Sequence, residues 1–198
     1  RVIYADGEDE RVLRATQVIL EEGIAAPILI GRPFVIEQRI ERFGLPLKPG
    51  KDFEIINPED DPRYKEYVSL FQSLVGRSGV TPDTARTIVR TNTTVIGALA
   101  VKRGDADGLI CGLQGRYIKH VRDIKSVIGL SEGVSNVSAL SMLIMPRGVF
   151  FLADTYVNMD PSADEIVSIT LQARDHLKRF NIEAKAALLS YSNFGSRI

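Results

Sequence analysis

The chain has 198 residues, 44% of them hydrophobic, which is enough to bury the core of one large domain or two small ones without disulfides. Lysine plus arginine and aspartate plus glutamate each total 25, so no net charge draws the protein toward nucleic acid or a membrane surface. Any anion site must therefore come from local clustering of cations. The single cysteine, Cys111, excludes an internal disulfide and a multi-cysteine metal site.

The expected location is the cytoplasm. One free thiol fits a reducing compartment, and a lone cysteine beside a strand is usually a small buried hydrophobe. The N-terminal stretch RVIYADGEDERV is not a signal peptide, because its apolar run ends at once in acidic residues. No window approaches the apolar length needed to span a bilayer, so we expect a soluble, unsecreted protein.

Short apolar runs alternate with helical patterns through the first part of the chain. The predicted strands are 1–5, 26–31, 53–58 and 107–112. The predicted helices are one that starts near Glu8 and others at 33–44, 61–76, 81–104 and, after the Gly112–Gly115 turn, from Arg116 on. This alternation of strands and helices favours a parallel sheet. Thr81 is the expected N-cap of the helix that follows it, and TNTT at 91–94 is expected to break or bend that helix.

The remaining part of the chain predicts a change to antiparallel pairing. The apolar segments 137–145 and 148–154, joined by PRG, read as a hairpin. A capping box of Ser162 and Glu165 starts a helix over 162–181, and 184–190 reads as a buried strand. Small turn residues near 130–137 indicate the boundary between two α/β units, 1–133 and 134–198.

Four loops follow predicted strands, at 5–7, 111–116, 153–158 and 190–196. Ligands of parallel sheets bind beyond the carboxyl ends of the strands, so all four are candidate binding loops. The loop SYSNFGS offers hydroxyls, an amide and an open glycine N–H, which suit a phosphate; its candidate residues are Ser190, Ser192, Asn193, Gly195 and Ser196. A plain polar turn is the alternative. Asp6 and Asp154, which end strands, are expected to cap turns rather than to act in catalysis.

The strongest cluster of cations follows the fourth predicted strand. Arg116 and Arg122 could give forked donors to a phosphate, and Lys119 could add a point charge. A solvated helix face is the alternative. His120 lies among these cations, and a role as general base is its less favoured interpretation.

Two further arginines precede the predicted helix break. Arg77, in a glycine-flanked loop before a helix, could reach an anion, and Arg90 less convincingly so. The short signatures of dinucleotide-binding folds, P-loops, zinc proteases and α/β-hydrolases do not occur. From its residues alone the chain is thus an α/β protein with an anion-binding cleft.

Four motifs, taken together, resemble the phosphate acetyl/butyryltransferase family. They are GVTPDTAR, GDADGLICG, FLADTYVN followed by DPSADEI, and ALLSYSNFGS, and they cover nearly the whole chain in order. Working phosphotransacetylases usually carry a Thr-rich loop and a VRP turn where this chain reads GLQGRYIKHVRD. This variant is similar to the C-terminal phosphotransacetylase-like domain of large, multidomain NADP-dependent malic enzymes, as are RVIYADGEDERVLRA, PILIGRP and FEIINPEDDPRYKEY.

The resemblance implies a fold of two three-layer α/β/α subdomains, with coenzyme A and the acyl phosphate in the cleft between them. It implies that Arg122 and the 190–196 loop face this cleft. Active members also take a Ser-Arg pair and an aspartate from a later segment, and the sequence ends at Ile198 before one. We therefore expect no catalysis by this segment itself. NADP and a divalent metal would belong to a malic-enzyme domain before Arg1.

Three functions follow from the resemblance. The first is a regulatory domain that binds acetyl-CoA, or coenzyme A, as an effector of malate oxidation. The second is a working phosphate acetyltransferase, and the third is a module for oligomerisation alone. The expected partners are a small acyl-CoA, the malic-enzyme domain of the same chain and further copies in a homo-oligomer, with neither nucleic acid nor membrane.

Overall fold

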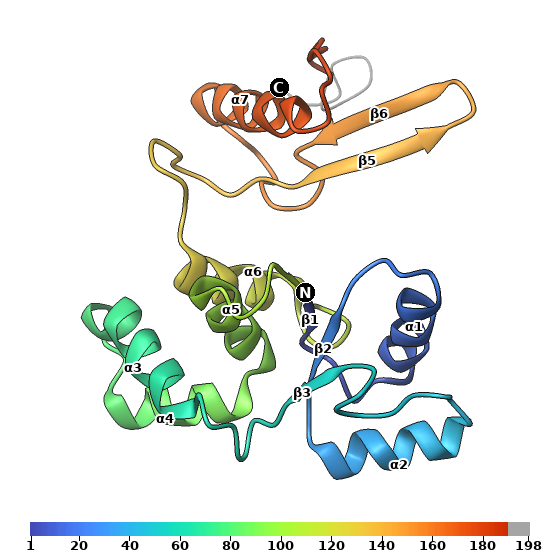
Figure 1. The fold of residues 1–198 in the computed structure, drawn as a ribbon. Coiled ribbons are helices and arrows are strands. Elements are labelled where there is room, and N and C mark those ends of the chain that lie inside the picture. The colour runs from blue at the N-terminus through green and yellow to red at the C-terminus, as the bar shows by residue number, and fades with distance from the viewer. Residues whose placement is uncertain (190–198) are drawn as a thin grey trace. The chain divides into compact units, whose positions relative to one another are not determined.

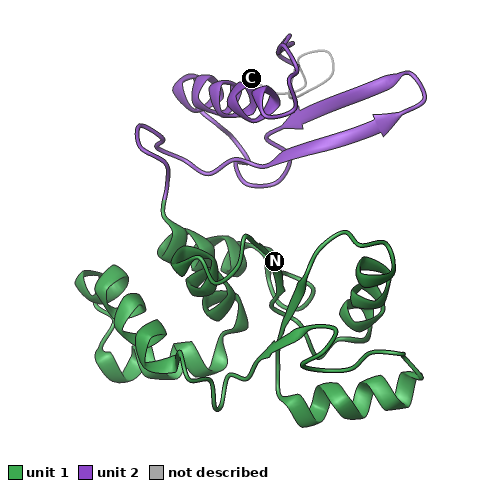
Figure 2. Cartoon of the chain, in the orientation of Figure 1, with its two compact units in different colours: residues 1–129 green, residues 130–198 purple. Residues whose placement is uncertain are grey.

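The computed structural model describes residues 1–189. The chain forms two compact units, 1–129 and 130–198, drawn in green and purple in Figure 2. The division between them lies slightly before the predicted one after residue 133. None of the helices within residues 1–189 has both the length and the apolar character that crossing a bilayer requires.

A four-stranded parallel sheet forms the centre of unit 1 (Figure 1). Its strands are β1 (Val2–Tyr4), β2 (Pro27–Ile30), β3 (Glu54–Ile56) and β4 (Gly108–Ile110), in the order β3-β2-β1-β4. Ile3 pairs with Ile28 on one side and with Leu109 on the other, so β1 joins the two halves of the sheet. The four predicted strands and their parallel pairing are confirmed.

Helices cover both faces of this sheet. They are α1 (Glu10–Glu21), α2 (Pro33–Phe43), α3 (Tyr64–Val75), α4 (Pro82–Thr91), α5 (Thr93–Arg103) and α6 (Tyr117–Ile128), with a short 3₁₀ turn, η1, at Gly76–Ser78. Successive residues of a strand point to opposite faces. Accordingly Leu29 packs in the core beneath α1 and α2, whereas Ile28 and Ile30 pack in the core beneath α3, α4 and α5. Unit 1 therefore has three layers.

The predicted helix over 81–104 is two helices that meet at Asn92. Thr81 caps α4 as expected, accepting a hydrogen bond from the Thr84 N–H (3.2 Å). Asn92 leaves the helical conformation, at φ −112° and ψ 96°, and its Oδ1 accepts from the Val95 N–H at the start of α5 (3.3 Å). An Asn side chain offers the backbone this alternative to a continuous helix, which accounts for the break in TNTT.

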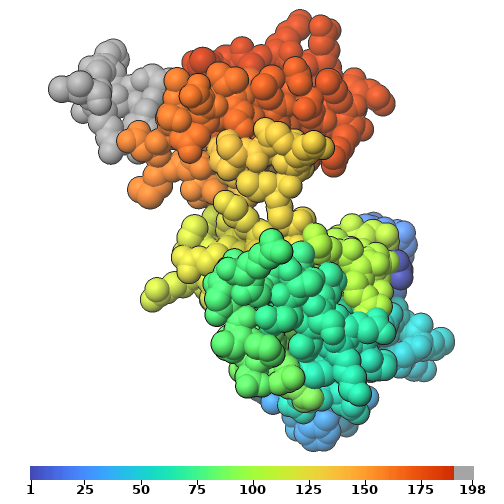
Figure 3. Space-filling view, turned by 90° about the vertical axis from the view of Figure 1, so that its left-hand side faces the viewer, coloured from blue at the N-terminus to red at the C-terminus, as the bar shows by residue number. Residues whose placement is uncertain are grey.

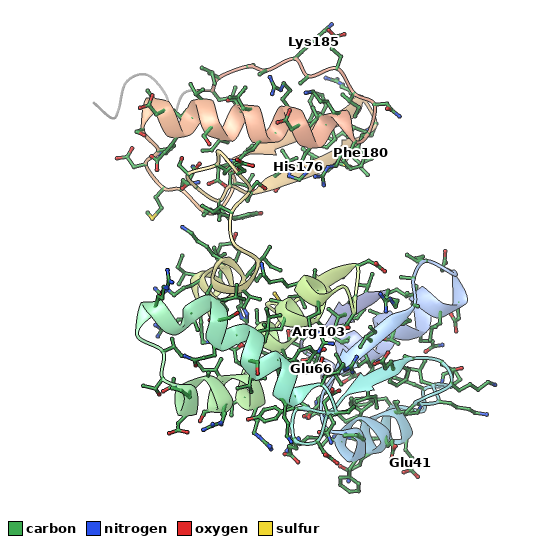
Figure 4. The ribbon with its side chains drawn as sticks, turned by 60° about the vertical axis from the view of Figure 1, so that its left-hand side comes forward. Glu41, Glu66, Arg103, His176, Phe180 and Lys185 are labelled. Atoms are coloured by element: carbon green, nitrogen blue, oxygen red, sulfur yellow. The ribbon has the colours of Figure 1, made fainter. Side chains whose placement is uncertain are left out.

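Polar contacts beside the core beneath α3, α4 and α5 join α3 to the end of α5. The Arg103 guanidinium pairs with Glu66, and Figure 4 shows these two side chains together. Arg103 also lies over the Tyr67 ring, 5.3 Å from its centroid. The Tyr67 hydroxyl donates to Asp105 Oδ2 (3.0 Å), and burial raises the pKa of this tyrosine well above its usual value. Figure 3 shows the adjoining surface of unit 1, in teal and green, on which α3 and α4 lie side by side.

Unit 2 begins with the predicted hairpin. Strands β5 (Leu140–Met145) and β6 (Gly148–Ala153) pair antiparallel, with Met145 opposite Gly148. Helix α7 (Ala163–Lys178) follows. Its capping box is present as predicted: the Glu165 N–H donates to Ser162 Oγ (3.3 Å), and the Ser162 N–H donates to Glu165 Oε2 (2.8 Å). Phe180, labelled in Figure 4, lies after α7 and packs on Phe151 of β6, with ring centroids 5.9 Å apart.

The predicted buried strand at 184–190 is wrong over its described part, 184–189. These residues form no strand, and Leu188 and Leu189 are 78% and 81% exposed. A strand needs a neighbour for its backbone hydrogen bonds, and the only described sheet of unit 2 is β5 with β6. The described residues of unit 2 therefore form one hairpin and one helix rather than three layers. Its apolar hairpin is largely exposed, as Ile144 (76%) shows.

We predict that Gly7→Ala destabilises unit 1 by about 1–3 kcal/mol, the usual cost of overpacking. A Cβ at Gly7 would lie 2.7 Å from the backbone oxygen of Ile30, too close for any real contact. Gly108→Ala is the matched control, because a Cβ there meets nothing within 4 Å. Denaturant unfolding followed by circular dichroism measures both, and equal stability of the two variants would contradict the close approach of the backbones.

Candidate functional site

The loops that follow β1 and β4 lie side by side at the carboxyl edge of the sheet. The Ala5 N–H donates to the Ile110 carbonyl (3.0 Å), which continues the pairing of the strands into the loops. The sequence predicted that these loops share an edge. The segment 111–116 and the first turns of α6 therefore form the candidate site, at an edge where parallel sheets bind ligands.

Two aspartates from the β1 side hold the segment after β4. Asp6 Oδ2 accepts from the Leu113 N–H (3.1 Å), and Asp9 Oδ2 accepts from Gln114 Nε2 (3.3 Å). Asp9 also caps α1 through the Arg11 N–H (2.9 Å). The side-chain hydrogen bond from Arg11 holds the pKa of Asp9 far below its usual value. Asp6 thus supports a turn, which is the role the sequence favoured.

His120 supports the same segment from the α6 side. Its Nε2 lies 2.7 Å from the Gln114 carbonyl oxygen, and its Nδ1 lies 2.9 Å from Thr94 Oγ1. A carbonyl only accepts, so Nε2 carries the hydrogen, and in the neutral ring Nδ1 accepts from the threonine hydroxyl. With both ring nitrogens engaged, His120 has a structural role here rather than that of a general base.

The glycines of the GLQG turn have backbone conformations that other residues rarely adopt. Gly112 has φ 97° and Gly115 has φ 99°. A Cβ on Gly115 would also lie 3.0 Å from His120 Nε2, so a side chain there would press against the ring. Glycine at this position permits both the turn and the close approach of His120.

Lys119 is paired within α6. Its Nζ lies 2.7 Å from Asp123 Oδ2, which also accepts from Asn92 Nδ2 (2.8 Å). Asp123 therefore joins α6 to the break between α4 and α5. The charge of Lys119 is balanced locally, so its contribution to anion binding is smaller than the sequence alone suggested.

Arg116 and Arg122 are both exposed, and within residues 1–189 neither forms an ion pair. Arg116 is the N-cap residue of α6, where no side chain caps the helix. Arg122 lies six residues further along, so the two guanidinium groups leave different faces of the helix. Their charges are available to an anion, and the N-terminal end of a helix favours negative charge.

The structure does not join the two other candidate arginines to this segment. Arg77 is exposed in η1, and no described hydrogen bond or ion pair links it to α6. Arg90 has a structural role: its guanidinium lies 4.3 Å from the Tyr64 ring centroid, and its Nη1 donates to the Glu59 carbonyl (3.1 Å).

The loop at 190–196, with its five predicted binding residues, lies outside the described residues and stays a prediction. The loop at 153–158 is held by Asp154. Its carboxylate accepts from the N–H groups of Ala139 (2.9 Å) and Asn158 (2.6 Å), among others. Burial alone would raise the pKa of Asp154, but these backbone hydrogen bonds lower it. Its role is the turn-forming one expected from the sequence.

Asn92 and Thr94 have a role at this site that the sequence did not predict. The TNTT motif indicated only a break in a helix, yet both side chains reach α6, 31 and 26 residues further along the chain. Polar side chains at the start of a buried helix were the available signal, because α5 is buried from Thr94 to Ala100.

Comparison with known proteins decides the family. The family model described as phosphate acetyl/butaryl transferase matches residues 1–198. The chain belongs to this family. The EutD phosphotransacetylase from Staphylococcus aureus superimposes with a TM-score of 0.85 at 25% identity, covering 100% of this chain and 58% of that one.

Malic enzymes are among the relatives in sequence. The chain is 62% identical over 197 residues to the NAD-dependent malic enzyme of Rhizobium meliloti (strain 1021), and 50% identical over 196 residues to the NADP-dependent malic enzyme of Escherichia coli (strain K12). These alignments cover 100% and 99% of this chain. The chain spans 26% of the length of either relative, so it corresponds to their phosphate acetyl/butaryl transferase region. The resemblance stated from the motifs is confirmed.

Cys111 follows β4 and is half-buried, with a hydrogen bond to Thr94. Burial raises the pKa of its thiol, and the negative charge of Asp6 raises it further. We predict that iodoacetamide at about pH 8 alkylates the folded protein more slowly than glutathione, since only the thiolate reacts. The same protein unfolded in urea is the control, and equal rates for the folded and unfolded protein would contradict the raised pKa.

Proposed function

We propose that this chain is the regulatory, phosphotransacetylase-like domain of a multidomain malic enzyme and that it binds acetyl-CoA as an effector. The observation that carries the proposal is the 62% identity to a malic enzyme of which the chain spans 26%. The malic-enzyme domain of the same protein would oxidatively decarboxylate malate to pyruvate, using a divalent metal and NADP. NAD is the alternative coenzyme, since relatives named for each are similar to this chain.

The proposal includes the complete family fold, two three-layer α/β/α subdomains with the ligand in the cleft between them. Unit 1 has the three layers that it requires, and the match to a phosphotransacetylase covers 58% of that chain. The serines and the amide of the 190–196 loop would hold the acyl or pantetheine end by hydrogen bonds.

The exposed arginines supply the chemistry for coenzyme A phosphates. Arg116 and Arg122 present guanidinium groups without a described carboxylate partner, and such groups bind phosphates by paired hydrogen bonds. Lys119 would contribute less positive charge to the site, because Asp123 already balances part of its charge. Arg77, exposed at the end of α3, is a further candidate contact.

The candidate site within residues 1–189 is better suited to binding a ligand than to removing a proton. A transferase that uses a thiol needs a group to remove its proton. His120 has both nitrogens engaged, Asp6 accepts from the backbone of Leu113, and the thiol of Cys111 has a raised pKa. A regulatory site needs only to bind acetyl-CoA more tightly in one arrangement of domains or subunits than in another.

The second candidate is a working phosphate acetyltransferase. The 30% identity to the phosphate acetyltransferase of Escherichia coli (strain K12) favours it. The third is a module for assembly alone, favoured by the exposed apolar side chains of the β5–β6 hairpin. The proposal also expects a homo-oligomer in the cytoplasm, consistent with the one free cysteine of the chain.

We predict that acetyl-CoA binds the full-length protein and that Arg116→Ala and Arg122→Ala each weaken binding about tenfold, by loss of a charge-assisted contact. Lys125→Ala is the matched control, because it removes a positive charge from the last turn of the same helix. Titration calorimetry measures each dissociation constant. Equal weakening by all three substitutions would show a general charge effect and contradict a phosphate contact at the start of α6.

We predict that the full-length protein does not convert acetyl phosphate and coenzyme A to acetyl-CoA. A phosphotransacetylase assayed in parallel is the positive control, and steady turnover would establish the second candidate instead.

The third candidate, a module for assembly alone, is tested by the thermal midpoint of the full-length protein. Acetyl-CoA at about a hundredfold excess over its dissociation constant stabilises a protein that binds it by about 2.7 kcal/mol, whereas a pure assembly module shows no shift.

A further inference from the structure

We infer that His120 is a positioning residue for the proposed acetyl-CoA site: its ring holds the Gly112–Gly115 turn against α5 and so sets where Arg116 meets the phosphate. The inference rests on the proposed function. The juxtaposition that carries it is one imidazole hydrogen-bonded to a buried hydroxyl on one side and to the exposed turn on the other.

The fixed end of this bridge is Thr94. Its side chain is 2% exposed at the start of α5, whose residues from Thr94 to Ala100 are all buried. A hydroxyl in such a close-packed environment cannot move far, because interiors are packed like crystals. Its 2.9 Å contact with Nδ1 therefore fixes the imidazole relative to the core of unit 1.

The adjustable end is the exposed turn. Residues 112–116 are all exposed, and Gly112 and Gly115 have φ angles available mainly to glycine. Glycine loses the most conformational freedom on ordering, so such a turn needs restraints to keep one shape. The 2.7 Å hydrogen bond from His120 Nε2 to the Gln114 carbonyl restrains it two residues before Arg116.

His120 is also linked to the backbone of Arg116 itself. The Arg116 carbonyl accepts from the N–H groups of Lys119 (3.0 Å) and His120 (3.4 Å) as α6 begins. The ring and the backbone of one residue thus hold both sides of Arg116. If the imidazole ring were displaced, the backbone of Arg116 would move and its guanidinium group would move with it, although the ring itself does not touch the ligand. Small displacements of a binding group cost affinity.

Two substitutions separate the halves of the bridge. His120→Gln keeps an N–H at about the reach of Nε2 and can still donate to Gln114. His120→Asn keeps a polar atom near the position of Nδ1, which can still contact Thr94, but it loses the hydrogen bond to the Gln114 carbonyl in the turn. In the full-length protein we expect His120→Asn to raise the dissociation constant for acetyl-CoA about tenfold and His120→Gln to leave it within about threefold.

A double-mutant cycle with Arg116→Ala distinguishes positioning from a general loss of stability. If His120 acts through Arg116, adding His120→Asn to Arg116→Ala weakens acetyl-CoA binding no further, because coupled groups are not additive. The full tenfold loss in the Arg116→Ala background would overturn the inference, since the effect would then bypass Arg116. Thermal midpoints without ligand record the stability of every variant.

Each other outcome also decides between the inference and the proposed function. If the unsubstituted protein binds acetyl-CoA and His120→Asn binds it equally well, the inference fails and the proposed function stands. If His120→Gln weakens binding as much as His120→Asn, the contact with Gln114 is not the one that matters, and the inference fails again. If the unsubstituted protein does not bind acetyl-CoA, the proposed function fails, and the inference fails with it.

Discussion

The parallel pairing of β1 with β4 is the constraint on which the candidate site depends. Val2 is opposite Gly108, so two segments at distant places in the chain are brought into one register. Each strand has only three residues, but their side chains contribute to the two cores of unit 1. Because parallel strands end at the same edge, this register puts Asp6 within hydrogen-bond distance of Leu113.

The site combines a rigid support with exposed charge. Asp6, Asp9, Thr94 and His120 hold the turn after β4 through hydrogen bonds. The two arginines that face solvent flank the first turns of α6. Neither arginine forms an ion pair within residues 1–189, so under the proposal their charges serve a ligand rather than the fold.

Most of unit 1 could be predicted from the sequence, since its apolar runs and helix signals are local. Thr81 in unit 1, like Ser162 in unit 2, caps its helix as its side chain predicts. The strand expected at 184–190 could not be judged in this way, because a run such as AKAALLS becomes a strand only beside another strand. Likewise, the sequence identified Lys119 as a cation but did not predict its ion pair with Asp123. It also singled out His120 but did not predict the contact with the Thr94 hydroxyl. Such contacts depend on how the helices pack.

The most direct test of the central claim is hydrogen exchange of the full-length protein with and without acetyl-CoA, followed by mass spectrometry of peptides across unit 1. Backbone amides that gain a ligand or become more rigid exchange more slowly. The account predicts slower exchange over residues 112–122 when acetyl-CoA is present. Unchanged exchange of this segment, with acetyl-CoA bound and slower exchange elsewhere, would contradict it.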